Sequence, residues 1–564
     1  MALSLLQLSI ISAILGHLSY VTYFIRGEKV TQSLRIFVAF VASPVVVTVV
    51  LSYAFGYPVF RAASTAATVW AGFVFGLFLN LSIYRIWFHP LKSYPGPFLS
   101  KITMWHHVLS TISKTDNYQR LHKLHEEYGD YVRVGPNLLS IADPDIVEIA
   151  HGSKTRFRKS EWYDMSHPLT SLQQMRDHQM HDKRRRGWWE KAFVMKSIRG
   201  YEPTVLKYAD LLIQRLKDHA GQVVDSTEWI NFFAFDVMGQ LSFGKSFENL
   251  QNGESHWFVR LIHENGIPLG TFGTVPYMLY LGFNLPAAIN PMSRLLEYSE
   301  KCVDSRITSG NNAAFPDVMS HILEAGPFFE DQTTEKLLLT GDSRLLIIAG
   351  SDTTATTISF AIYYLATSPS LLEQLRKELD QHYISENDPF SIEGLQYLPL
   401  LNAVINEVLR LHPPVPGGVY RDAPPEGISI NEHFIPPRAV TIAPNFTIQR
   451  SPKAFVRPNE FIPERWTTQP ELILDKSAWY PFSLGRYGCV GKQLALMELR
   501  TVLTKVALEL DVKLAPGETG KRLLEESKDI FTMTALSLEV VFTPRKRYDS
   551  RSMERKSSPQ VQNA

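Results

Sequence analysis

The order of apolar and polar positions divides the chain into a short apolar part and a long amphipathic part. Three apolar stretches come first, at about residues 3–25, 36–55 and 65–84. Each is close to the roughly 20 residues that a helix needs to cross a bilayer. Beyond them the pattern changes to long amphipathic helices with short strand-like runs, such as YVRVGPNLLSIA and LSLEVVF. This pattern predicts membrane-spanning helices followed by a mainly α domain with small β-sheets.

Basic residues around the apolar stretches predict how they are oriented. Arg26, Lys29 and Arg35 lie between the first and second stretches, whereas only Arg61 lies between the second and third. The positive-inside rule then places the amino terminus in a lumen and the large domain in the cytosol. A cleaved secretory signal is the competing interpretation, but no basic residue precedes the first stretch. Pro44 and small polar residues dilute the later stretches, so a re-entrant or interfacial course for one of them is an open alternative to three spans.

Proline and charge mark two further boundaries. The segment HPLKSYPGP, residues 89–97, contains three prolines and cannot continue a helix. We therefore expect a hinge here, between an anchor region at residues 1–88 and a folded domain at residues 98–544. Residues 545–564 are charged and polar, which predicts a disordered tail.

Composition narrows the possible partners. The 564 residues include 57 basic and 56 acidic side chains, so the overall charge does not favour nucleic acid as a partner. Only two cysteines are present, Cys302 and Cys489, and they lie far apart in the sequence. Two cysteines give no disulfide framework, which suits a domain that faces a reducing compartment.

Cys489 stands in the most distinctive segment of the chain, PFSLGRYGCVG at residues 481–491. Glycines allow the backbone to turn tightly and to approach a flat cofactor closely. An amphipathic helical run follows at once, and the amide groups at its start can stabilise a thiolate. This context makes Cys489 a candidate metal ligand, although a lone cysteine is more often an inert buried residue.

Three other motifs carry polar residues in unexpected places. AGSDTT, residues 349–354, interrupts an apolar helical run, where polar residues compete for backbone hydrogen bonds. HQMHDKRRRGWWEKAF, residues 178–193, places His181 and Arg185 one helical turn apart. Glu407 and Arg410 are three residues apart, and PERW follows later in the chain. Taken singly, each motif has an ordinary interpretation, namely a solvent-facing helix or a surface ion pair.

Together these motifs resemble those of cytochrome P450 enzymes. Phe482, Gly485, Cys489 and Gly491 stand in the register of that family's haem-binding loop. Tyr487 occupies the position of an arginine that usually contacts a haem propionate, so a tyrosine hydroxyl would have to replace that contact. The resemblance implies a cytochrome P450 fold, haem b (iron protoporphyrin IX) as the cofactor and Cys489 as the ligand of its iron.

The resemblance also implies roles for other residues. AGSDTT matches the family pattern without a departure, which implies that Asp352 and Thr353 lie over the distal face of the iron and manage protons during dioxygen activation. His181, Arg185 and Arg421 are the best matches to residues that contact the haem propionates. Because Arg185 has an arginine on each side, the sequence leaves open which of residues 184–186 reaches the haem.

A separate group of residues is expected to be structural. By the same resemblance, Glu407, Arg410 and the arginine of PERW, Arg465, form a buried network behind the haem-binding loop. The hinge resembles the proline-rich segment that orients the catalytic domain of P450 enzymes on a membrane.

The expected function is that of a haem-thiolate monooxygenase. A thiolate ligand on haem iron favours cleavage of the O–O bond, so one oxygen atom can enter an apolar small molecule. The chain has no flavin or nicotinamide fingerprint, so NADPH–cytochrome P450 reductase is the expected electron donor, with cytochrome b5 as a possible second one. The reductase would dock on the Cys489 side of the domain, against basic residues such as Lys492. Membrane lipid is the other expected partner.

The same resemblance implies a location and a class of substrate for the protein. We expect an endoplasmic reticulum membrane protein with its catalytic domain in the cytosol. The hinge and loop look most like those of fungal members, many of which tailor secondary metabolites.

Two alternatives stay open: redox-neutral or peroxide-driven chemistry on the same scaffold, and a membrane-anchored haem carrier or sensor without turnover.

Overall fold

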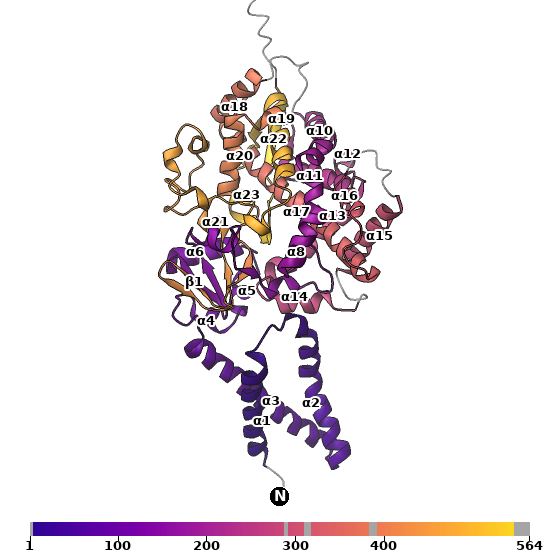
Figure 1. Ribbon diagram of the computed structural model, residues 1–564, viewed down its shortest axis with the longest axis vertical. Coiled ribbons are helices and arrows are strands. Elements are labelled where there is room, and N and C mark those ends of the chain that lie inside the picture. Colours follow the sequence, from indigo (N-terminus) through magenta and orange to yellow (C-terminus); the bar gives the residue numbers. More distant parts are fainter. Residues whose placement is uncertain (1–3, 287–291, 310–316, 383–391, 546–564) are drawn as a thin grey trace, which may run out of the picture.

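A computed structural model describes residues 4–286, 292–309, 317–382 and 392–545. Figure 1 shows three amino-terminal helices that project from a larger and mainly helical body. The expected disordered tail lies outside the described residues, apart from Arg545.

The projecting helices are α1 (Leu5–Ser19), α2 (Ser33–Phe55) and α3 (Val59–Ile83). One π-helical turn extends α1 to Phe24, and another extends α3 to Phe88. All three helices are long and apolar enough to cross a membrane. The third begins at Val59, directly after Pro58, rather than near residue 65, where its most apolar part starts.

Small residues allow α1 and α3 to pack closely. A Cβ atom added at Gly76 would lie 2.0 Å from the carbonyl oxygen of Ala13, and one at Gly16 would lie 2.1 Å from that of Phe73. Such close backbone approach is typical of helix pairs in lipid, where van der Waals packing replaces the hydrophobic effect as the source of association. The two helices therefore form a pair, and α2 stands beside it.

The body contains small sheets, of which the largest lies close to the anchor helices (Figure 1). It has five strands in the order β1-β2-β8-β5-β3. The strand-like run YVRVGPNLLSIA forms the antiparallel hairpin of β1 and β2. The strands of this sheet are β1 (Tyr131–Gly135), β2 (Leu138–Ile141), β3 (Arg158–Lys159), β5 (Tyr420–Asp422) and β8 (Val440–Ile442). The other sheets are formed by β4 (Val223–Asp225), β9 (Leu510–Leu514) and β12 (Glu539–Pro544), by β6 (Ile428–Ile430) and β7 (His433–Ile435), and by β10 (Lys528–Ile530) and β11 (Thr532–Thr534).

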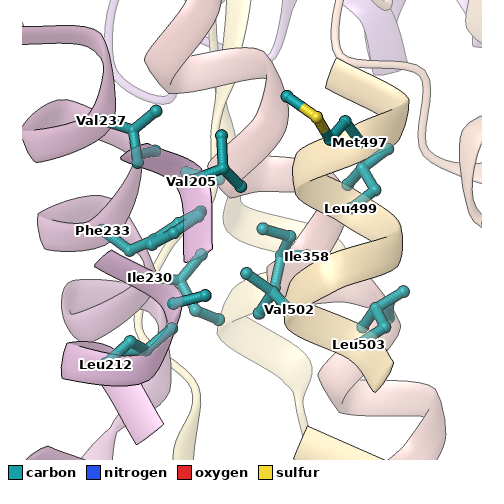
Figure 2. Close-up of a cluster of buried hydrophobic side chains, with 14 of the residues drawn as sticks. Val205, Leu212, Ile230, Phe233, Val237, Ile358, Met497, Leu499, Val502 and Leu503 are labelled. Carbon is teal, nitrogen blue, oxygen red and sulfur yellow. The ribbon is translucent and has the colours of Figure 1, made fainter. Parts of the chain in front are cut away.

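Four long helices form the centre of the body: α10 (Met195–Asp218), α11 (Ser226–Phe243), α17 (Gln332–Thr367) and α22 (Lys492–Glu509). Figure 2 shows their apolar side chains in one cluster, with Phe233 of α11 and Ile358 of α17 facing Val502 of α22. By composition α17 could also cross a membrane, but 72% of its most apolar window is buried inside the body. It is therefore a core helix.

Shorter helices complete the body. They are α4 (Phe98–Ile102), α5 (Trp105–Thr111), α6 (Asn117–Tyr128), α7 (Ile146–His151), α8 (His178–Arg184), α9 (Glu190–Ala192), α12 (Asn249–Asn252), α13 (Trp257–Phe272), α14 (Pro276–Phe283), α15 (Ser293–Ser309), α16 (Val318–Glu324), α18 (Pro369–His382), α19 (Ile392–Leu395), α20 (Pro399–Leu411), α21 (Asn445–Ile448) and α23 (Lys521–Glu526). The predicted fold class, mainly α with small sheets behind amino-terminal apolar helices, is confirmed.

Candidate functional site

The loop before α22 holds Cys489 at the wall of a cavity of about 310 Å³. The amide of Cys489 donates a hydrogen bond to the carbonyl oxygen of Phe482, at 2.8 Å, which closes the loop. Gly485 has a φ of +56°, and a Cβ atom there would lie 2.6 Å from the carbonyl carbon of Gly152. Both the backbone conformation and the space therefore require glycine at this position.

Opposing effects act on the pKa of the Cys489 thiol. Its exposed surface faces the cavity that it lines. Burial raises the pKa of the thiol above its ordinary value, while the amides of Gly491 and Lys492 and the charge of Arg185 lower it by less. The start of α22 thus favours the thiolate, as the sequence predicts, but does not outweigh burial. A metal cation on the sulfur would supply the missing stabilisation.

The AGSDTT segment of α17 borders the same cavity through Ala349 and Thr353. The helix stays α-helical here, and the Thr353 hydroxyl donates to the carbonyl oxygen of Ala349 at 2.8 Å. A hydroxyl and a thiol therefore border one cavity from different elements.

Asp352 is held by a residue that the sequence did not identify. Its Oδ1 lies 3.2 Å from Nε2 of His263 on α13, and its Oδ2 is 3.5 Å from the Thr532 hydroxyl. Burial lowers the pKa of His263, but the hydrogen bond and charge of Asp352 outweigh burial and raise it above the ordinary value. The two side chains therefore form an ion pair when His263 is protonated.

A group of cations surrounds Tyr487 on another side of the cavity. The Arg421 guanidinium lies 4.7 Å from the centre of the Tyr487 ring, and the Lys159 ammonium lies 4.8 Å from it. The His181 ring meets the tyrosine edge-on, with ring centres 4.8 Å apart. Burial, with the charges of Arg421 and Arg185, lowers the pKa of Lys159 well below its ordinary value. Sequence reasoning missed Lys159, which reaches this group because β3 pairs with β5.

The three consecutive arginines point to different places. Arg184 is fully buried and forms an ion pair with Asp342 on α17, at 2.8 Å. Arg186 is exposed. Arg185 lines the cavity and donates to the carbonyl oxygen of Gly488, at 2.6 Å. Of the three, Arg185 is thus the arginine that borders the site.

The polar and cationic side chains that line the cavity suit a haem group. Arg421 Nε and the Tyr487 hydroxyl are buried without a hydrogen-bond partner, and neither Arg421 nor Lys159 is paired with a carboxylate among the described residues. Such groups suit the propionates of a porphyrin. Over the same residues, no cluster of three or more His, Cys, Asp or Glu side chains could hold a bare metal ion. A metal on Cys489 would therefore have to arrive with most of its ligands, as haem iron does.

Comparison with known proteins decides the family. The family described as Cytochrome P450 matches residues 95–542 of the chain. The chain belongs to the cytochrome P450 family. The family implies a haem iron cofactor and the enzyme class of monooxygenase, as the sequence predicted.

Several P450 relatives match this chain over nearly its whole length. The cytochrome P450 monooxygenase FCK2 of Fusarium pseudograminearum is 35% identical over 94% of this chain and 97% of its own. The cytochrome P450 monooxygenase notG' of Aspergillus versicolor is 37% identical over 96% and 99%, respectively. A tryprostatin B 6-hydroxylase of Aspergillus fumigatus is 34% identical over 95% and 96%. The matches therefore extend into the amino-terminal apolar region.

A buried ionic network joins α20 to the segment that contains Arg465. Glu407 accepts from Arg410, at 2.8 and 2.9 Å, and from Arg465, at 2.9 Å. All three side chains are fully buried. The amide of Ile462 and the indole of Trp466 also donate to this carboxylate, at 3.0 and 2.9 Å. The structure thus brings together the three residues of the expected network, and every oxygen of Glu407 is satisfied.

Proposed function

We propose that this protein is a membrane-anchored haem-thiolate monooxygenase that inserts one oxygen atom of O2 into an apolar small molecule. The cofactor would be haem b, ligated by Cys489, and the electrons would come from NADPH through a separate reductase. Its place would be a tailoring step in fungal secondary metabolism, an assignment supported by relatives such as the tryprostatin B hydroxylase. The observation that carries the proposal is the single cavity bordered by the Cys489 sulfur and the Thr353 hydroxyl.

Each wall of the cavity would have a separate task. When bound, thiolate-ligated haem supplies an oxidant that can attack unactivated C–H bonds. Arg421, Lys159, Arg185 and the Tyr487 hydroxyl would hold the propionates, with Tyr487 in place of the usual arginine. Phe482, Gly485 and Gly491 would let the loop approach the porphyrin face closely. The burial of His181 lowers its pKa to about 2, so it would act as a neutral hydrogen-bonding group.

Asp352 and Thr353 would manage protons on the side away from Cys489. The Thr353 hydroxyl donates to a backbone carbonyl, which leaves its oxygen free to accept a hydrogen bond in the cavity. Asp352 is buried, with 4% of its surface exposed, so a partner side chain with more exposure offers it a route to solvent. His263, which is 30% exposed, is the partner through which a proton could enter.

The proposed location is the endoplasmic reticulum membrane, with the body in the cytosol, and contacts of the anchor support this orientation. The loop between α1 and α2 contacts the body through Glu28, which forms an ion pair with Arg176. This loop must therefore lie on the same side of the bilayer as the body. Arg26, Lys29 and Arg35 lie in or beside this loop, so the positive-inside rule makes that side the cytosol.

The electron donor would dock behind the haem-binding loop. Lys492 is exposed at the start of α22, three residues after Cys489. A reductase with an acidic docking face would meet this charge close to the proximal ligand. Cytochrome b5 would be expected to use the same face.

Reconstitution tests the proposal against its alternatives. The full chain, loaded with haem and supplied with NADPH–cytochrome P450 reductase, should oxidise a compound that accumulates when the gene is deleted. Oxidation should require NADPH and O2, and it should fall at least about tenfold in Thr353→Ala. Product formation without NADPH or reductase would instead indicate redox-neutral or peroxide-driven chemistry. Haem binding without NADPH consumption would indicate a carrier or sensor.

A further inference from the structure

A second cavity, of about 350 Å³, adjoins the one that contains Cys489. The two share the lining residues Tyr163, Gln173, Leu345, Phe531 and Thr532. Most of the other lining residues of the second cavity are apolar, and α13, α14 and α17 contribute many of them. Asp352 lines it as well, so it lies next to the proposed oxidation site and has the size of a small-molecule chamber.

Arg344 of α17 is an unusual member of this apolar wall. Its Nε and Nη1 atoms are buried and have no hydrogen-bond partner among the described residues, and over the same residues the side chain forms no ion pair. Burial alone shifts the pKa of this guanidinium, lowering it to about 10, and no neighbouring carboxylate raises it. An arginine remains charged in such a setting, so the cavity contains a cation to which the part of the chain that the structure describes supplies no counter-ion.

The acids near Arg344 along the helix are engaged elsewhere. Asp342 is paired with Arg184, and Asp352 is paired with His263. The segment of residues 287–291, whose structure is not described, contains no Asp or Glu in its sequence and cannot supply one. A guanidinium with unpartnered buried atoms is costly to keep in an apolar wall, and an anionic ligand would offset that cost.

We infer that Arg344 binds a carboxylate, or a similarly acidic oxygen group, of an otherwise apolar substrate. The inference rests on the proposed monooxygenase function and specifies its substrate class. Gln173 is a second donor for the same group, since it lines both cavities and its side chain makes no hydrogen bond among the described residues. A guanidinium and an amide can together satisfy both oxygens of a carboxylate.

The position of Arg344 also predicts where the substrate is oxidised. Arg344 and Thr353 are nine residues apart on α17, which is about 13 Å along the helix axis and about 180° around it, so they face different cavities. Leu345, which lines both cavities, lies between them. The substrate would therefore extend past Leu345, and the oxidised carbon would be on the order of 10 Å from the acidic group.

A pair of probes that differ only in charge tests this inference. The probes are 6-phenylhexanoate and its primary amide, titrated calorimetrically near neutral pH into the full haem-loaded chain in lipid nanodiscs. Wild type should bind the acid at least about tenfold more tightly than the amide. Arg344→Gln should lose this preference, and Arg344→Lys should keep part of it because the charge remains.

The control removes a cation from the exposed part of the same helix. Lys336→Gln should bind both probes as wild type does, because Lys336 pairs with Glu300 and Asp304 on the surface. Equal affinity of wild type for the two probes, no binding of the acid, or a preference that persists in Arg344→Gln would overturn the inference. Haem content and the spectrum of the ferrous carbon monoxide complex, recorded on the same samples, report separately on the proposed function.

Discussion

At the residue scale, Glu407 is the residue whose loss should be most damaging to stability. It is fully buried and compensates two arginines, Arg410 and Arg465. Glu407→Gln keeps the shape but leaves two buried cations without an anion, so we expect a loss of about 3–5 kcal/mol in the free energy of unfolding. Chemical denaturation in detergent measures this loss. Glu393→Gln, which breaks the exposed pair with Arg199, should change little, and a similar loss in both variants would contradict the buried network.

His263 predicts a pH dependence with a definite sign. Asp352 raises the pKa of His263 above its ordinary value of 6.5. Protonation of His263 therefore stabilises the folded state fully below pH 6.5, and this stabilisation is lost as the pH rises through the higher folded-state pKa. Wild type should lose unfolding free energy over this range relative to His263→Gln. Parallel pH profiles of the two proteins, measured by denaturant titration, would contradict the ion pair.

Residues within motifs could be predicted from sequence, and residues outside them could not. Cys489, Asp352 and Thr353 stand at fixed spacings that the family pattern specifies. Lys159 and His263 have no such pattern, because each reaches the site through a contact between segments far apart in the chain. Lys159 depends on the pairing of β3 with β5, and His263 depends on α13 packing beside α17.

At the element scale, the loop between α1 and α2 is docked onto the body. Arg176 binds Glu28 at 2.5 and 2.7 Å, and Glu161 accepts from the amides of Lys29 and Val30 at 2.9 and 3.3 Å. The Glu161 segment continues directly into Trp162, which lines the second cavity, and Tyr163, which lines both. The anchor is thus connected to the wall of the proposed substrate chamber.

Glu28→Lys should loosen this connection. The new charge would repel Arg176, so the amides of residues 161–166 should exchange hydrogen a few-fold faster, which corresponds to about 1 kcal/mol or less for a partly exposed pair. Hydrogen-exchange mass spectrometry on the full chain in nanodiscs measures this rate. Glu393→Lys is the matched control, and equal exchange in the two variants would show that Glu28 does not hold the segment.

Element types were easier to predict than element ends. The three anchor helices follow from their apolar length. The start of α3 at Val59 depends on Pro58, whose effect a hydropathy pattern does not register. Likewise, α17 resembles a membrane span by composition, and only the helices packed around it identify it as core.

At the scale of the whole molecule, the anchor, the chamber and the haem-binding loop form one continuous path. The docked loop contacts the Glu161 segment, this segment lines the chamber, and the chamber adjoins the cavity that contains Cys489. The fold class could be predicted because a few motifs occur in a fixed order. The substrate could not be predicted, because most of the side chains that line the chamber, apart from Asp352, belong to no family motif.

The most direct test is the spectrum of the ferrous carbon monoxide complex in two variants, each of which replaces one of the two cysteines. The full chain, reconstituted with haem, should show the red-shifted Soret band that thiolate ligation produces. Cys302→Ser should keep this band, because Cys302 lies on α15, outside the cavity. Cys489→Ser should lose it. Retention of the band in Cys489→Ser, or its loss in Cys302→Ser alone, would contradict the assignment of Cys489 as the iron ligand.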